Sequence, residues 1–224
     1  MAVYKKSAEM RSHILCTTEQ LVLQNGYKKT TIKDVADHLG VPRSLIYYYF
    51  KDKRDIMTVL YQERFQNVDV IVSSILPRGK EPMVRLILKY LVFRQTVSSN
   101  PLFTEFIMES EFAILDPNAV ASQIERYYAD SRDAFAACGK SVSSKQFNVH
   151  VHILEGVARA LIMAEYYQTL TLTDWEAMDY LGKYSIMPTF ELTEAEYHQI
   201  LSRVFKLAEQ IQHLTAVSKA PSIV

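Results

Sequence analysis

Apolar residues recur three and four positions apart along most of the chain, which is the spacing of one face of an α-helix. The first stripe includes Ile14, Leu15 and Val22 and ends at Asn25-Gly26, residues that suit the left-handed end of a helix. No alternating pattern as long as a β-strand accompanies these stripes. We therefore predict an all-α protein with helices at residues 7–24, 32–39, 43–50, 53–74, 82–98, 101–115, 118–137, 145–168, 173–187 and 193–214.

Two short helices near the N-terminus are separated by a sharp break. Thr31 is placed to cap the first of them, with Asp34 in its first turn. Residues 40–42 (Gly-Val-Pro) end that helix and start the next, because glycine accepts a positive φ and proline suits a first helical turn. Short helices joined by such a turn and flanked by longer helices are typical of a helix-turn-helix, whose second helix reads DNA.

The second short helix has two dissimilar faces. Ile46 and Phe50 fall on one side and are predicted to be core. The other sides carry an arginine, which can bind guanine bidentately, a leucine, which can meet a thymine methyl, and three consecutive tyrosines. The alternative is that the tyrosines are packing aromatics in the corner of a helical bundle. The predicted DNA-contacting residues are Arg43, Ser44, Leu45, Tyr47, Tyr48 and Tyr49, with Thr31, Lys33 and Lys53 at the flanking backbone.

Three runs of residues resemble the DNA-binding region of the tetracycline-repressor (TetR) family: 30–36 (TTIKDVA), 40–41 (GV) and 45–53 (LIYYYFKDK). The resemblance covers about residues 8–60. It implies a regulator, here taken as a repressor, that binds a palindromic DNA operator as a homodimer and is released by a small-molecule effector. Pro42 stands where the family usually has Ser or Thr, and Ser44 and Leu45 depart from its commoner small residues. These departures leave the operator sequence open.

The charged residues are distributed unevenly between the N-terminal part and the remainder of the chain. Residues 1–55 carry ten Lys and Arg against six Asp and Glu, whereas the remainder carries fifteen against nineteen. A basic N-terminal segment beside an acidic remainder indicates that only the N-terminal segment binds a polyanion such as double-stranded DNA. We expect a helix-turn-helix domain at residues 1–55, a helical ligand-binding and dimerisation domain at 56–215 and a C-terminal tail at 216–224.

Two helices of the C-terminal part carry features of a subunit interface. Small residues recur every fourth position in the helix at 145–168, which lets another backbone approach closely. The last helix has a capping box at Thr193 and Glu196 and an apolar stripe. The TetR resemblance implies that two such helices from each protomer form a four-helix bundle; the alternative is that both stripes are core of one chain. The predicted dimer interface comprises Gly156, Ala160, Ala164, Val204, Ala208 and Ile211.

No motif marks an effector pocket, so aromatic residues and methionines inside the body are the candidates. Glu105 and Glu109 lie one turn apart in an apolar run and could counter a cationic ligand, although a solvated face is the simpler interpretation. Glu155 and Arg159 are interpreted as an ion pair within one helix. We expect a largely apolar or aromatic effector, contacted by Tyr61, Phe65, Phe93, Phe106, Glu109, Tyr127, Met163 and Tyr166.

Several function classes are not favoured. The chain has no Glu-x-x-His pair, nucleophile elbow, phosphate loop or Cys/His quartet, so we expect no enzyme, cofactor or metal. His150 and His152 point to different sides of a helix. A charged N-terminus and short apolar runs indicate neither a signal peptide nor a membrane span, and the spacing of Cys16 and Cys138 suits a reduced cytoplasmic protein. A helical adaptor remains the alternative, but it would not require an exposed tyrosine face.

Overall fold

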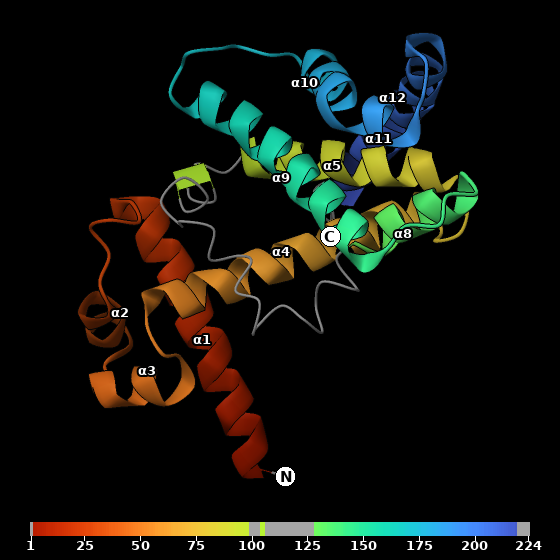
Figure 1. Ribbon diagram of the computed structural model, residues 1–224. Helices are drawn as coiled ribbons and strands as arrows, with labels where there is room; N and C mark the ends of the chain where they lie inside the picture. Colours follow the sequence, from red (N-terminus) through yellow and green to blue (C-terminus); the bar gives the residue numbers. More distant parts are fainter. Residues whose placement is uncertain (1, 99–103, 106–127, 219–224) are drawn as a thin grey trace. The chain divides into compact units, whose positions relative to one another are not determined.

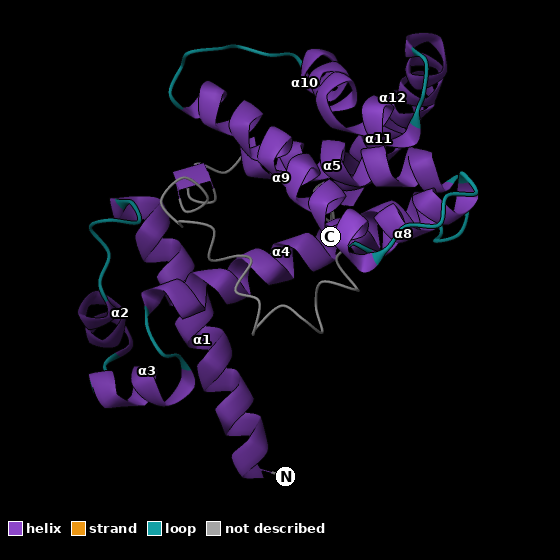
Figure 2. Ribbon diagram, in the orientation of Figure 1, coloured by secondary structure: helices purple, strands orange, loops and turns teal. Residues whose placement is uncertain are grey.

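The computed structural model describes residues 2–98, 104–105 and 128–218 (Figure 1). All regular elements within these residues are helical (Figure 2), which confirms the predicted all-α fold with an N-terminal helix-turn-helix. The first five helices are α1 (Ala2–Asn25), α2 (Ile32–Leu39), α3 (Arg43–Tyr49), α4 (Lys53–Ile75) and α5 (Pro82–Ser98). The later elements are α8 (Ala129–Ala137), α9 (Ser144–Tyr166), α10 (Asp174–Leu181), the π-helical segment Gly182–Ile186, α11 (Met187–Phe190) and α12 (Glu194–Ser218).

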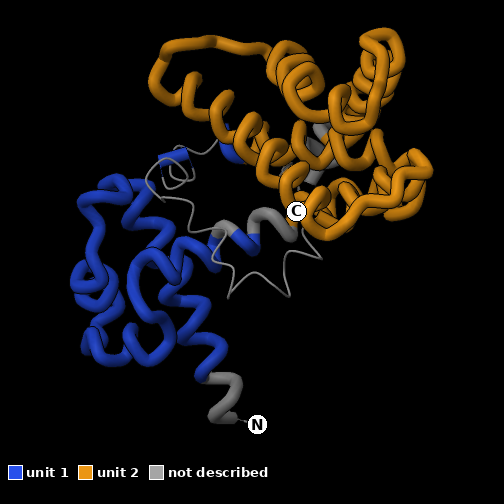
Figure 3. Tube along the Cα trace, viewed as in Figure 1, with its two compact units in different colours: residues 1–66, 97–116 blue, residues 67–96, 117–224 orange. Residues whose placement is uncertain are grey.

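The chain divides into two compact units (Figure 3). The first combines Met1–Gln66 with Val97–Asp116, and the second combines Asn67–Thr96 with Pro117–Val224. The helices α4 and α5 therefore each contribute residues to both units. The domain limits expected at residues 55 and 215 stay predictions.

Local side-chain bonds set the ends of the N-terminal helices. Thr31 caps α2: its hydroxyl accepts from the Asp34 backbone N–H at 3.2 Å, and the Asp34 carboxylate accepts from the Thr31 N–H at 2.8 Å. Bonds from Thr31 hold the pKa of Asp34 below its ordinary value. Gly40 ends α2 at φ 65°, and Asp52 caps α4 by accepting from the Asp55 N–H at 2.8 Å. These caps confirm the predicted helix boundaries, because capping is decided by nearest neighbours.

The second unit contains a buried cluster of four charged side chains. Arg85 of α5 lies 2.7 Å from Asp130 of α8 and 2.7 Å from Asp69 of α4. One turn further along α5, Lys89 lies 2.6 Å from Asp130 and 3.1 Å from Asp69. Arg85 and Asp130 are almost completely buried, whereas the Asp69 side chain is half exposed. Paired charges thus tie α4, α5 and α8 together around the apolar core of this unit.

Some predicted helix boundaries are wrong. The helix expected at 118–137 is not continuous, because Tyr128 is not helical (φ −103°, ψ 18°) and α8 begins at Ala129; residues 118–127 lie outside the described part of the structure. The helix expected at 173–187 was to stop before Pro188, but the chain stays helical through a π-helical segment into α11 and ends at Glu191, with φ 58°. Proline is tolerated here because it occupies the first turn of α11. The π-helical segment begins at Gly182, where a Cβ would overlap the ring of Tyr197, so the glycine lets α12 pack closely.

Candidate DNA-binding and sensing sites

The recognition helix α3 separates its two faces as predicted. Ile46 and Phe50 are completely buried, and this packing fixes the helix in the first unit. Tyr47 and Tyr48 expose 54% and 78% of their surface, and Arg43 and Ser44 are exposed as well. Leu45 and Tyr49 are half-buried, and the ring of Tyr49 packs edge-on against Tyr48 at 5.0 Å. The outward face of α3 therefore offers one cation, one hydroxyl and two phenols for contact with another molecule.

The flanking residues differ in how freely they can meet a DNA backbone. Lys33 is exposed at the start of α2. The Thr31 hydroxyl already donates to the Asp34 carboxylate at 2.7 Å, so a phosphate contact through this hydroxyl competes with the cap of α2. Both contacts stay predictions, and Lys33 is the more accessible donor.

Lys53 has an internal role that the sequence did not predict. Its ammonium donates hydrogen bonds to the carbonyls of Tyr27 and Thr30, the second at 2.8 Å. It also lies 3.9 Å from the centre of the Tyr27 ring, a cation–π distance. Lys53 thus joins the start of α4 to the turn before α2. A phosphate contact by Lys53 stays a prediction, and mutation of this residue would disturb the turn as well.

Residues 14–60 match the family model described as bacterial regulatory proteins, tetR family. These residues contain the end of α1, the capped α2, the exposed α3 and the start of α4. Within residues 14–60 the chain therefore resembles the TetR family.

Curated relatives match about a third of the chain. The HTH-type transcriptional repressor BepR of Brucella suis is 33% identical over 70 residues, which cover 31% of this chain and 34% of BepR. The HTH-type transcriptional regulator AcrR of Shigella flexneri is 33% identical over 64 residues, 29% of this chain and 30% of AcrR. The match therefore spans about a third of each relative's length.

Solved structures resemble nearly the whole chain. RolR in complex with resorcinol has a TM-score of 0.64 at 14% identity, covering 89% of this chain and 96% of that one. A TetR-family transcriptional regulator from Syntrophomonas wolfei has a TM-score of 0.59 at 17% identity, covering 84% and 98%. At these identities the likeness shows the fold: a helix-turn-helix followed by a helical C-terminal part.

Three of the predicted effector residues have described side chains. Phe93 of α5 is half-buried and packs against the core of the second unit, and Met163 of α9 is half-buried too. Tyr166 is exposed near the end of α9, with its ring 5.2 Å from that of Tyr167. The side chains of Tyr61 and Phe65, and the residues Phe106, Glu109 and Tyr127, lie outside the described part of the structure.

The sequence did not predict a part-buried hydrogen bond between α5 and α9. The Tyr90 hydroxyl donates to the Glu155 carboxylate at 2.7 Å, and Tyr128 also hydrogen-bonds this carboxyl. Burial raises the pKa of Glu155 above its ordinary value, and the two phenols oppose that shift. The interpretation of Glu155 as an ion-pair partner of Arg159 overlooked these phenols, because Tyr90 is 65 positions away and no periodicity reports the contact.

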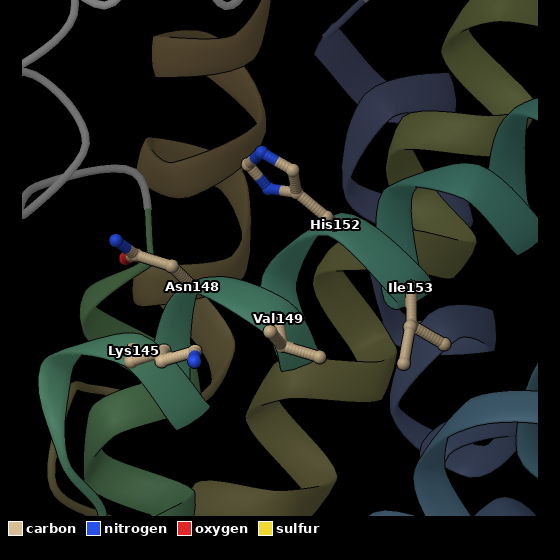
Figure 4. A pocket seen from close by; sticks show the side chains of 5 residues that line it. All are labelled: Lys145, Asn148, Val149, His152 and Ile153. Carbon is tan, nitrogen blue, oxygen red and sulfur yellow. The ribbon is translucent and has the colours of Figure 1, made fainter.

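The predicted dimer interface divides into two parts. Gly156 and Ala160 are exposed on α9, and Val149 and Ile153 on the same helix expose 53% and 46% of their surface. An open hollow of about 590 Å³ lies over this helix, lined by Lys145, Asn148, Val149, His152 and Ile153 (Figure 4). Ala164 is half-buried at the far end of the stripe.

The predicted interface residues on α12 lie in a different environment. Val204, Ala208 and Ile211 are buried in the core of this chain, so their own chain covers them. This is the alternative that the sequence left open for both stripes, and it accounts for the apolar pattern of α12 without a partner. Of the two predicted stripes, only the one on α9 is exposed, and its role in a dimer stays a prediction.

Two kinds of feature are absent from the described residues. No helix among them is long and apolar enough to cross a membrane. Within the same residues, no three His, Cys, Asp or Glu side chains are grouped so that they would hold a metal ion.

Proposed function

We propose that this protein is a TetR-family repressor that binds a palindromic operator as a homodimer and releases it when a small, largely apolar or aromatic effector binds the C-terminal part. The observation that carries the proposal is the two-faced helix α3, with Ile46 and Phe50 buried and Arg43, Tyr47 and Tyr48 exposed. One such helix reads only a few base pairs, and a two-fold axis doubles the footprint and makes the operator palindromic.

The effector part of the proposal is supported by the contact between α5 and α9. Tyr90 and Phe93 of α5 pack partly buried against the core of the second unit, and the Tyr90 hydroxyl bonds Glu155 of α9. Met163 of α9 is half-buried in the same unit. The carboxyl of Glu155, bonded by two phenols, would supply one polar anchor in an otherwise apolar site. RolR, which shares the fold, was solved with resorcinol, a small aromatic molecule, and this supports an aromatic effector here.

DNA reading is tested by comparing two exposed cations. DNA selected from a random pool by the wild-type protein supplies the cognate site. Arg43→Ala should lose about 1–3 kcal/mol on that site and little on unselected DNA, because bidentate contact with a base is sequence-dependent. Lys33→Ala should weaken binding about equally on both and reduce the salt slope by ~1. Fluorescence anisotropy titrations at several salt concentrations measure both effects; equal losses for Arg43→Ala on the two DNAs would show that it contacts phosphate alone.

Dimerisation through α9 is tested with Gly156→Leu. No atom lies within 4 Å of the position that a Cβ would occupy, so the folded chain accepts a larger side chain there. In a dimer packed on this stripe, leucine should hold the two helices apart and weaken association at least about tenfold. Analytical ultracentrifugation at low micromolar concentration measures the dissociation. The matched control is Ala136→Leu, at an exposed position of α8. An unchanged dimer in both variants would place the interface elsewhere.

A further inference from the structure

A residue far along the chain holds the turn that precedes the helix-turn-helix. The carboxylate of Glu105 accepts a hydrogen bond from the backbone N–H of Tyr27 at 2.9 Å. Both carboxylate oxygens also lie 3.5 Å from the position of a Cβ on Gly26, whose φ is +84°. Glu105 belongs to Val97–Asp116, the segment that groups with the N-terminal helices in the first unit (Figure 3). The contact therefore lies within one compact unit.

The backbone of Tyr27 is held at its carbonyl as well. Lys53 at the start of α4 donates to the carbonyls of Tyr27 and Thr30, while Glu105 accepts the N–H of Tyr27. Thr30 is followed directly by Thr31, the capping residue of α2. The position of this turn consequently sets where α2 starts and, through the packing of α2 on α3, where the recognition helix lies.

Glu105 is itself connected to α5. The hydroxyl of the neighbouring Thr104 is buried and donates to the carbonyl of Val97, in the last turn of α5, at 3.0 Å. The helix α5 also carries Tyr90 and Phe93, which the proposed function places at the effector site. A continuous series of covalent and hydrogen bonds thus runs from α5 through Thr104 and Glu105 to the turn before α2.

We infer that Glu105 is a positioning residue for operator binding: by holding the N–H of Tyr27 it orients the helix-turn-helix of each protomer and so sets the separation of the two recognition helices. The inference rests on the proposed function. A palindromic operator presents its half-sites one helical turn of DNA apart, and a small rotation of each helix-turn-helix misplaces the second recognition helix. Loss of the Glu105 contact should therefore affect binding to two half-sites together and leave each single half-site unaffected.

The test uses full-length protein and the palindrome that the wild type selects from a random DNA pool. Further DNAs carry one or two extra base pairs between the half-sites, or a single half-site. E105A should bind the palindrome roughly tenfold more weakly, with a smaller penalty for the extra base pairs, and bind the half-site within about twofold of wild type. E105Q should stay near wild type, because its amide oxygen still accepts from the Tyr27 N–H.

Two further variants sharpen the result. Thr104→Val removes the hydroxyl that bonds Val97 and should shift the spacing preference in the same direction as E105A, which keeps the inference testable if E105A folds poorly. Glu63→Ala makes the same charge change on an exposed face of α4 and should leave the spacing preference unchanged. Melting temperatures of all four variants report folding.

Three results would overturn the inference. Unchanged affinity and spacing preference in both E105A and Thr104→Val would show that the contact does not position the recognition helices. Equal losses by E105A and E105Q on every DNA, the half-site included, would assign Glu105 a general charge effect. A wild-type protein that selects no sequence from the pool would overturn the proposed function itself, and that outcome is read before any variant is made.

Discussion

Asp130→Ala should lower the free energy of unfolding by about 3–5 kcal/mol, because it removes the carboxylate shared by two buried cations, Arg85 and Lys89. Both cations would stay inside the second unit, where Asp69 is their other acidic partner and is itself half exposed. Two buried cations would then share one half-exposed carboxylate, and this excess of buried positive charge costs far more than the loss of a surface contact. Urea-induced unfolding at a fixed protein concentration measures the change.

Asp133→Ala is the matched control for this prediction. Asp133 lies one turn from Asp130 on α8 and pairs with Arg78 at 2.7 Å, but the Arg78 side chain is 59% exposed. Exposed ion pairs contribute at most about 1 kcal/mol, so this variant should unfold close to wild type. Similar small losses in both variants would contradict the view that the buried cluster ties α4, α5 and α8 together. Should Asp130→Ala not accumulate as folded protein, Asp130→Asn keeps the side-chain volume and should fall between the two.

Stability should also decrease on acidification because of His150. This histidine is only 4% exposed, with its ring between Phe135 and Phe190 and its Nδ1 3.1 Å from the Thr189 hydroxyl. Desolvation lowers its pKa from 6.5 to about 4, since burial disfavours the imidazolium. The unfolded chain binds a proton between these two pH values and the folded chain does not, so unfolding becomes easier as pH falls from 6.5 to 4.

The size of this effect follows from the shift in the pKa of His150. The contribution of neutral His150 to the free energy of unfolding is fully present above pH 6.5. By pH 4 the free energy of unfolding has fallen by about 3 kcal/mol on account of this residue. In His150→Asn that part of the pH dependence should disappear, whereas His152→Asn on the exposed face of the same helix should keep it. Unfolding free energies at pH 7, 5.5 and 4 compare the three proteins. Parallel pH profiles for wild type and His150→Asn would show that His150 titrates normally.

The helix-turn-helix could be predicted from the sequence because short-range interactions determine it. The bonds of Thr31 with Asp34 and of Asp52 with Asp55 join residues three positions apart, and Gly40 supplies the left-handed turn by itself. Ile46 is buried and Tyr48 is exposed because residues two positions apart lie on opposite sides of a helix. None of these features needs a distant partner.

The C-terminal half behaves differently because helical periodicity identifies an apolar stripe but not the surface that covers it. The stripes of α9 and α12 look alike in the sequence, yet Gly156 and Ala160 are exposed whereas Val204 and Ala208 are buried. Pro188 predicted a break that the structure does not have, since packing of α12 at Gly182 coincides with a π-helical segment leading into α11. Burial of a stripe is decided by which helices meet, and that is a tertiary property.

The sequence by itself determined the class of fold, the caps and turn of the helix-turn-helix and the outward residues of α3, since all of these depend on neighbours within about one helical turn. The tertiary structure alone decided the partners of Glu155, Lys53, Arg85 and Glu105. Each of these charged side chains is bonded to a residue at least 16 positions away. A charge taken out of water requires a partner, but it is the packing of the helices that brings one within reach.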